Sequence, residues 1–176
     1  AVGADPKTGD GAGILLHVPD KFLRSIHGES LPKKSDYGVG NFFFPKNKKL
    51  ATEIKNITES FIKSCGLEFI SWRLLTVNNS GLGMGAKSCE PDTIQLIVGR
   101  KKDILPENFE MILYWLRKRI ENKVESLKAQ DKEGFYINSL SSKTIVYKGM
   151  LLSNQLEEYF DDLKNDLFES AIALVH

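Results

Sequence analysis

FYINSLSSKTIVY, residues 135–147, places two short runs of aromatic and β-branched residues on either side of a polar segment. Such residues favour strands, and a polar connection of about five residues is typical of a β-hairpin. The sequence therefore predicts strands over residues 135–138 and 144–147, joined as a hairpin by residues 139–143.

Similar runs predict further strands on both sides of this segment, and apolar residues at helical spacing lie between them. The clearest helical stripe is Leu50, Ile54, Ile57, Phe61 and Cys65, with Gly66 as a C-cap candidate. In chain order, strands are predicted at 14–18, 37–44, 67–77, 93–98, 135–138, 144–147 and 171–176, and helices at 19–28, 46–65, 106–124 and 153–163. Residues 78–91 are predicted to be loop and 128–134 a charged linker. Because no repeat divides the 176 residues, we expect one domain of α+β or layered α/β class.

The composition excludes several classes of protein. The 24 Lys and Arg residues nearly balance the 23 Asp and Glu residues, so we expect neither nucleic acid nor a membrane as a partner. Cys65 and Cys89 form neither a disulfide framework nor a metal half-site, which favours a reducing, intracellular compartment. The three histidines lack metal-ligand spacing, so no metal site is predicted. No apolar run approaches the ~20 residues of a transmembrane helix.

Two glycine-rich segments, residues 9–13 and 81–88, are candidates for phosphate binding. The second has the spacing of a P-loop, but Ala86 replaces a glycine and Pro91 follows within a turn. We interpret both segments as tight turns, and a nucleotide-binding module remains an alternative.

The candidate nucleophiles are equally incomplete. Cys89 has no histidine base near it in the sequence, and a polar connection explains the serines at 139, 141 and 142 beside Lys143 more simply than a Ser/Lys dyad. Residue patterns alone therefore provide no complete catalytic constellation.

Longer segments, in order along the chain, carry a family resemblance. GADPKTGDGAGI at residues 3–14, YGVG at 37–40 and SLSSKTIVYKGML at 139–151 resemble the N-terminal amidotransferase domain of glutamate synthase large subunits. These domains are class II glutamine amidotransferases of the N-terminal-nucleophile (Ntn) hydrolase superfamily. The resemblance covers residues 1–176 and implies that the chain is a fragment of a four-layer αββα sandwich with mainly antiparallel sheets.

The resemblance also implies a nucleophile, an N-terminal cysteine that attacks the glutamine side-chain amide with its own α-amino group as base. An α-amine suits this role because its pKa, about 8, lies near working pH. Neither Cys65 nor Cys89 matches this residue, so we expect the catalytic cysteine to lie upstream of Ala1.

The substrate-binding residues are expected just after His176, because ALVH at residues 173–176 resembles the strand that leads into the family's Ser-Arg-Phe-Ser-Thr-Asn segment. By position, Asp10, Gly11 and His176 are expected to lie near the site. Residues 1–176 would then be a partial glutamine amidotransferase type 2 domain that is inactive by itself.

The implied function is release of ammonia from glutamine for transfer to 2-oxoglutarate by a synthase domain of the same polypeptide. FMN and an iron–sulfur cluster would belong to other parts of that enzyme, with no cofactor in this fragment. Either the cytoplasm or an organelle such as a plastid suits these expectations. The alternative is a non-catalytic structural or interaction domain that retains the amidotransferase fold.

Overall fold

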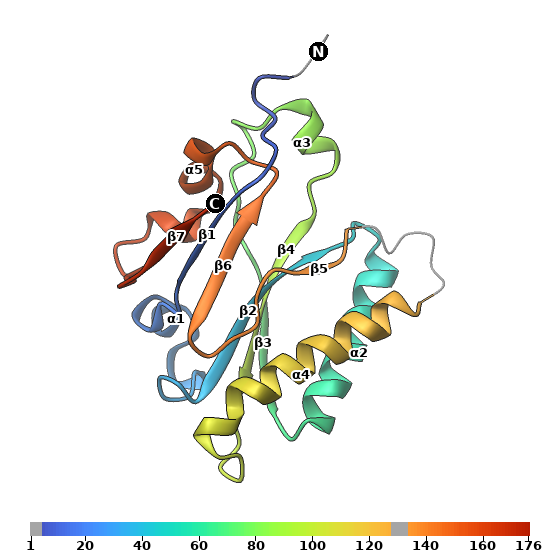
Figure 1. Cartoon of the computed structure of the whole chain (residues 1–176), viewed down its shortest axis with the longest axis vertical. Coiled ribbons are helices and arrows are strands. Elements are labelled where there is room, and N and C mark those ends of the chain that lie inside the picture. Colours follow the sequence, from blue (N-terminus) through green and yellow to red (C-terminus); the bar gives the residue numbers. More distant parts are fainter. Residues whose placement is uncertain (1–4, 128–133) are drawn as a thin grey trace.

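The strands form two antiparallel sheets in the computed structural model, which describes residues 5–127 and 134–176 (Figure 1). The three-stranded sheet has the order β6-β1-β7, with β6 (Thr144–Gly149), β1 (Ala12–His17) and β7 (Ala173–Val175). The four-stranded sheet has the order β3-β4-β2-β5, with β3 (Glu68–Leu74), β4 (Asp92–Gly99), β2 (Tyr37–Phe44) and β5 (Tyr136–Ile137). Every neighbouring pair is antiparallel, which confirms the α+β class with antiparallel sheets.

Two long helices, α2 (Lys48–Ser64) and α4 (Pro106–Glu125), cover one face of the four-stranded sheet (Figure 1). Both begin close to the predicted positions. The Asn47 side chain caps α2 by accepting from the backbone N–H groups of Lys49 and Leu50, both at 3.1 Å, and Pro106 occupies the first turn of α4. The remaining helices are α1 (Asp20–His27), α3 (Met84–Ser88), α5 (Leu156–Tyr159) and the 3₁₀ turns η1 (Gly28–Ser30), η2 (Ser153–Gln155) and η3 (Asp161–Lys164).

Alternation along β2 and β4 divides the buried side chains between two cores. Phe42 and Phe44 of β2 pack with α2 and α4, whereas Val39 packs with the three-stranded sheet. The same division separates Leu96 from Ile97 on β4. The four-stranded sheet is therefore a central layer covered on both faces, which explains why β2 and β4 are buried over almost their whole length.

The predicted hairpin of residues 135–147 is wrong, although both of its strands exist. β5 pairs with β2 of one sheet and β6 pairs with β1 of the other, so residues 138–143 cross between the sheets. Glu110 of α4 holds this crossing by accepting from the hydroxyls of Ser141, at 2.5 Å, and Ser142, at 2.7 Å. Ser141 and Ser142, which suggested a turn, thus bind α4 through Glu110. β5 and β6 each pair with a strand that is distant in the sequence.

Side chains also satisfy the outer edge of β6. The Asn41 amide donates to the Val146 carbonyl at 3.1 Å, and the Ser139 hydroxyl accepts from the Val146 N–H at 3.0 Å. These bonds occupy backbone groups that an edge strand otherwise leaves unpaired. They also tie the two sheets together.

Two further expectations need correction. The helix predicted over residues 153–163 is broken at Phe160, where the backbone is extended and bridges to Val77. The Asp161 N–H accordingly donates to the Thr76 carbonyl at 3.3 Å instead of continuing a helix. The predicted loop at 78–91 contains α3, and most of the predicted linker at 128–134 lies outside the described residues.

Candidate functional site

The three residues expected near the site, Asp10, Gly11 and His176, line one surface hollow of about 360 Å³. The hollow lies on the three-stranded sheet, where β1 begins and β6 and β7 end. Its lining also includes Gly13, Leu15, Val146, Lys148 and Leu174. The fold therefore brings together residues that are more than 160 positions apart in the sequence.

Pairing of β7 with β1 places His176 in this hollow. Ile14 lies opposite Val175 in the ladder, and the pairing continues to the next residues. The Gly13 N–H donates to the His176 carbonyl at 3.1 Å, and the His176 N–H donates to the Gly13 carbonyl at 3.0 Å. These two bonds fix the backbone of His176 while its side chain remains exposed.

A close contact requires glycine at position 13, and the backbone conformation requires it at position 11. A Cβ at Gly13 would lie 2.8 Å from the Cβ of Lys148, closer than side-chain atoms approach in proteins. Gly11 has a φ of +132°, a conformation that L side chains rarely adopt. Glycine at these positions therefore lets the chain enter β1 and pair closely with the end of β6.

Lys148 is the charged residue of the hollow that the sequence analysis missed. Its Nζ lies 3.9 Å from the centroid of the Tyr136 ring, a cation–π contact, and the described residues give this ammonium no carboxylate partner. Lys148 lies in SLSSKTIVYKGML, residues 139–151, and this family-like segment is the sequence feature that could have identified it as a site residue. The lining of the hollow therefore includes one cationic side chain, Lys148, and one anionic side chain, Asp10.

Residues 5–8, which precede the first glycine-rich segment, dock on the second one. The Asp5 carboxylate accepts from the Met84 N–H at 2.5 Å, at the start of α3, and the Gly83 N–H donates to the Lys7 carbonyl at 3.1 Å. Hydrogen bonds from the backbone N–H of Lys7 and then of Met84 lower the pKa of Asp5. An anion of the chain itself thus occupies the position that a nucleotide phosphate would need, which counts against the nucleotide-binding alternative.

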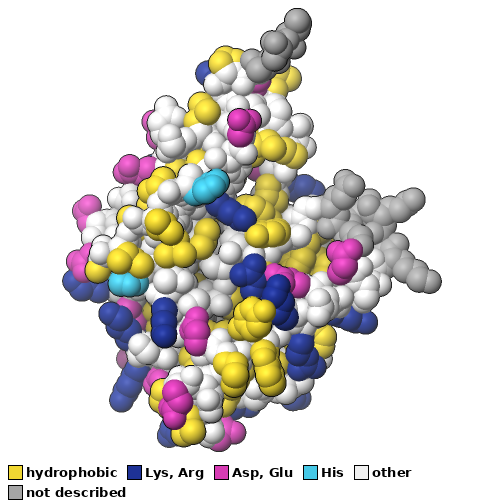
Figure 2. All heavy atoms as spheres, viewed as in Figure 1, with side chains coloured by type: hydrophobic (Ala, Val, Ile, Leu, Met, Phe, Trp, Pro, Cys, Tyr) yellow, Lys and Arg dark blue, Asp and Glu magenta, His cyan; other side chains and the backbone are white. Residues whose placement is uncertain are grey.

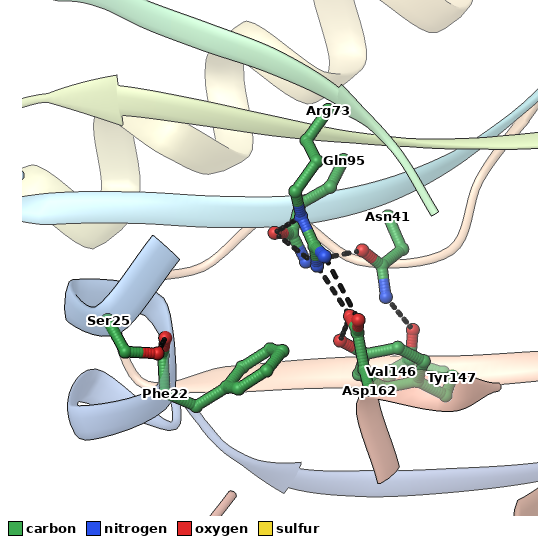
Figure 3. Close-up of polar contacts among 8 residues, drawn as sticks. All are labelled: Phe22, Ser25, Asn41, Arg73, Gln95, Val146, Tyr147 and Asp162. Carbon is green, nitrogen blue, oxygen red and sulfur yellow. Dashed lines mark hydrogen bonds and ion pairs between the residues drawn. The ribbon is translucent and has the colours of Figure 1, made fainter. Parts of the chain in front are cut away.

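A buried polar network holds the segment that leads to β7 (Figure 3). Arg73 of β3 donates to Asp162 of η3 at 2.9 and 2.5 Å, and the Tyr147 hydroxyl of β6 donates to the same carboxylate at 2.8 Å. Gln95 of β4 accepts from Arg73 at 3.0 and 3.1 Å and donates to Asn41 of β2 at 3.0 Å.

Figure 3 shows the side chains of the four-stranded sheet pointing across to β6 and η3. Burial first, and the nearby Asp162 charge second, raise the pKa of Tyr147 well above its ordinary value. The hydroxyl therefore stays protonated and keeps donating to the carboxylate. Both sheets and η3 are fixed relative to one another by this network.

Comparison with known proteins identifies the family. The whole chain, residues 1–176, matches the sequence profile of the class II glutamine amidotransferases. The chain belongs to this family. It is 39% identical to the glutamate synthase [NADPH] large chain of Bacillus subtilis (strain 168), over 99% of this chain and 11% of that protein.

Other relatives give the same result. The large chain of Azospirillum brasilense glutamate synthase [NADPH] is 39% identical over 100% of this chain and 12% of its own length. The chloroplastic ferredoxin-dependent glutamate synthase 2 of Arabidopsis thaliana is 36% identical over 99% of this chain and 11% of its own length. The chain thus spans about a tenth of the length of the curated relatives it matches.

In the part of the chain that the structure describes, no candidate nucleophile lies beside a candidate base. The Cys89 thiol is exposed and lies 3.5 Å from the Met150 sulfur, without a histidine beside it. The Ser141 hydroxyl donates to Glu110 instead of forming a dyad with Lys143. Across residues 5–127 and 134–176, no group of three or more His, Cys, Asp or Glu side chains is arranged to hold a metal, and no helix could cross a bilayer.

Proposed function

We propose that residues 1–176 form the scaffold of the glutaminase domain of a glutamate synthase, which releases ammonia from glutamine for the synthesis of glutamate. The observation that carries this proposal is the pairing of His176 with Gly13, because it gathers Asp10, Gly11 and His176 around one hollow. The family match over the whole chain supports the amidotransferase part, and the names of the relatives support the glutamate synthase part.

In this proposal, a cysteine upstream of Ala1 supplies the nucleophile, and its α-amino group serves as base. Its thiolate attacks the side-chain amide carbon of glutamine, and ammonia leaves as a thioester forms. Water then hydrolyses the thioester to release glutamate. Residues that follow His176 bind the glutamine carboxylate and form the oxyanion hole.

The residues of this chain support the chemistry by position and charge. The ladder between β1 and β7 places the backbone of His176 beside Gly13, in the lining of the hollow. Lys148 and Asp10 both line the hollow, so a cationic and an anionic side chain are available there to a charged substrate.

Of the implied cofactors, the iron–sulfur cluster does not fit the residues that the structure describes. The two cysteines, Cys65 and Cys89, follow different helices, α2 and α3, and neither joins a group of three possible ligands. We propose that FMN, the iron–sulfur cluster and the synthase domain belong to other parts of the polypeptide. We also propose that the enzyme is intracellular, in the cytoplasm or in an organelle.

The test compares glutamine hydrolysis by residues 1–176 with that of a longer polypeptide that has an N-terminal cysteine and the residues after His176. We expect glutamate release only from the longer protein, and its loss when the N-terminal cysteine is changed to serine. Activity of residues 1–176 alone would refute the proposed position of the nucleophile. An inactive longer protein with intact secondary structure would instead support the non-catalytic alternative.

A further inference from the structure

The pairing of β7 with β1 has a register that side-chain burial does not explain. All three residues of β7, Ala173–Val175, are exposed, and Figure 2 shows hydrophobic side chains at the surface over β7 and β1. A strand is usually held in one register by a buried face, because a shift of one residue would turn that face to solvent. Within the described residues, another contact must therefore set the register of β7.

The Ser170 side chain makes such a contact at the point where the ladder stops. The pairing of the two strands ends at Leu16 and Ala173. A regular antiparallel ladder would continue with a bond from the His17 N–H to the Ile172 carbonyl. Instead, the Ser170 hydroxyl accepts from the His17 N–H at 2.8 Å and donates to the Ile172 carbonyl at 2.5 Å. One side chain thus occupies both groups that the next ladder bond would use.

A neighbouring residue keeps Ser170 at this position. The Phe168 ring packs against the rings of Phe22 and Tyr147, with centroids 5.2 and 5.7 Å apart. A shift of β7 by two residues would preserve its faces but would move His176 by about 7 Å along β1. Such a shift would also break the bond between Ser170 and β1, so this bond selects the observed register.

We propose that Ser170 is a positioning residue for glutamine binding. Its hydroxyl sets the register that pairs His176 with Gly13, and thereby fixes the point from which the chain continues after His176. This inference rests on the proposed function, in which the residues after His176 bind glutamine. Ser170 precedes β7 and His176 follows it, so Ser170 acts on the substrate only through the strand.

Amide hydrogen exchange of residues 1–176 tests the register without an assay of activity. Ser170→Ala removes both hydrogen bonds of the hydroxyl, so the amides of Gly13 and His176 should exchange about fivefold faster, the equivalent of one net hydrogen bond. Ser170→Thr keeps a hydroxyl and should exchange like the parent. The control is Ser30→Ala, which removes an exposed hydroxyl that donates to the His27 carbonyl at 2.6 Å, and it should change neither amide.

The second measurement is glutamine hydrolysis by the longer polypeptide described above. Ser170→Ala should raise the KM for glutamine by about fivefold with a smaller change in kcat, because the residues that bind glutamine are displaced. Ser170→Thr and Ser30→Ala should match the parent. A variant that was merely less stable would lose active molecules, which lowers the apparent kcat and leaves KM unchanged.

Unchanged exchange at Gly13 and His176 in Ser170→Ala would overturn the inference, and so would an unchanged KM. Equal losses in Ser170→Ala and Ser170→Thr would also overturn it, because the hydroxyl would then not be the cause. An inactive parent polypeptide would instead refute the proposed function, and with it the role of Ser170 in glutamine binding. The exchange result would still decide whether Ser170 sets the register.

Discussion

The carboxylate of Asp162 should be among the most sensitive polar groups of the fold. We expect Asp162→Ala to lower the free energy of unfolding by about 3 kcal/mol. The carboxylate accepts three hydrogen bonds, two from Arg73 and one from Tyr147. Both donors would remain, with the Arg73 side chain only 18% exposed and Tyr147 fully buried.

The magnitude follows from the cost of leaving a buried charge unpaired. Removing one partner of a buried ion pair costs roughly 3–5 kcal/mol. Gln95 would still accept two hydrogen bonds from Arg73, and water reaches part of the guanidinium, so the lower end of this range is expected. The loss of the Tyr147 hydrogen bond is included in this total of about 3 kcal/mol, because Arg73, Tyr147 and Asp162 act as one network.

Equilibrium urea unfolding provides the assay. With a denaturant slope of about 2 kcal/mol per molar, a loss of about 3 kcal/mol lowers the midpoint by about 1.5 M. The matched control is Asp161→Ala, because Asp161 is 46% exposed and pairs with Lys164 at 3.0 Å on the surface. The control should cost about 0.5 kcal/mol or less.

Equal costs for the two variants would refute the reasoning. A second check is the pair of changes Arg73→Met and Asp162→Leu in one protein, which removes both buried charges. The double variant should lose clearly less than the sum of the two single variants, since neither charge is left unpaired. Additive losses would show that packing, and not charge, sets the cost.

Two further predictions concern Gly13 and Asp5, near the start of the chain. Gly13→Ala should lower the free energy of unfolding by about 1–3 kcal/mol, because the new methyl group would lie 2.8 Å from the Lys148 Cβ. Gly81→Ala, where the nearest atom is 3.9 Å away, should cost less than about 0.5 kcal/mol, and the same urea assay would contradict the steric argument if the two were alike. The pKa of Asp5 in the folded protein lies below its ordinary value of 3.8. The hydrogen bonds to the ionised carboxylate therefore stabilise the fold above pH 3.8, and this stabilisation is lost as the pH falls through the lowered pKa. Hydrogen exchange at the Met84 amide should therefore depart from its ordinary pH dependence only below pH 3.8, and an Asp5→Asn variant that still showed this change would contradict the assignment.

Local patterns predicted most of the secondary structure. The strand at 37–44 matches β2 residue for residue, and Pro106 begins α4 as expected, because each of these signals lies within a few neighbouring residues. The stripe of α2 was only partly correct. Its most deeply buried residues are Leu50, Ile54, Thr58 and Ile62, and the Thr58 hydroxyl is buried because it donates to the Ile54 carbonyl at 2.8 Å.

Errors arose where a distant partner determined the local structure. Nothing near Phe160 indicates that the helix must end there, because the cause is its bridge to Val77. The start of α3 depends on Asp5, almost 80 residues earlier, whose carboxylate provides the cap. Neither partner can be found from propensity or periodicity.

The candidate site shows the same division. Family motifs selected Asp10, Gly11 and His176 as near-site residues, and this assignment stays a prediction although the fold places them together. Lys148 was missed as a site residue because its relation to the hollow depends on the pairing of β6 with β1.

The sequence by itself determined the family, the α+β class and the positions of the main helices and strands, because these follow from motifs and from the spacing of neighbouring residues. Only the tertiary structure decided that β5 and β6 join different sheets and that one polar network holds those sheets together. The physical reason is that strand pairing and buried hydrogen bonds depend on partners far along the chain. Each such bond therefore requires the folded cores, which hold those partners side by side.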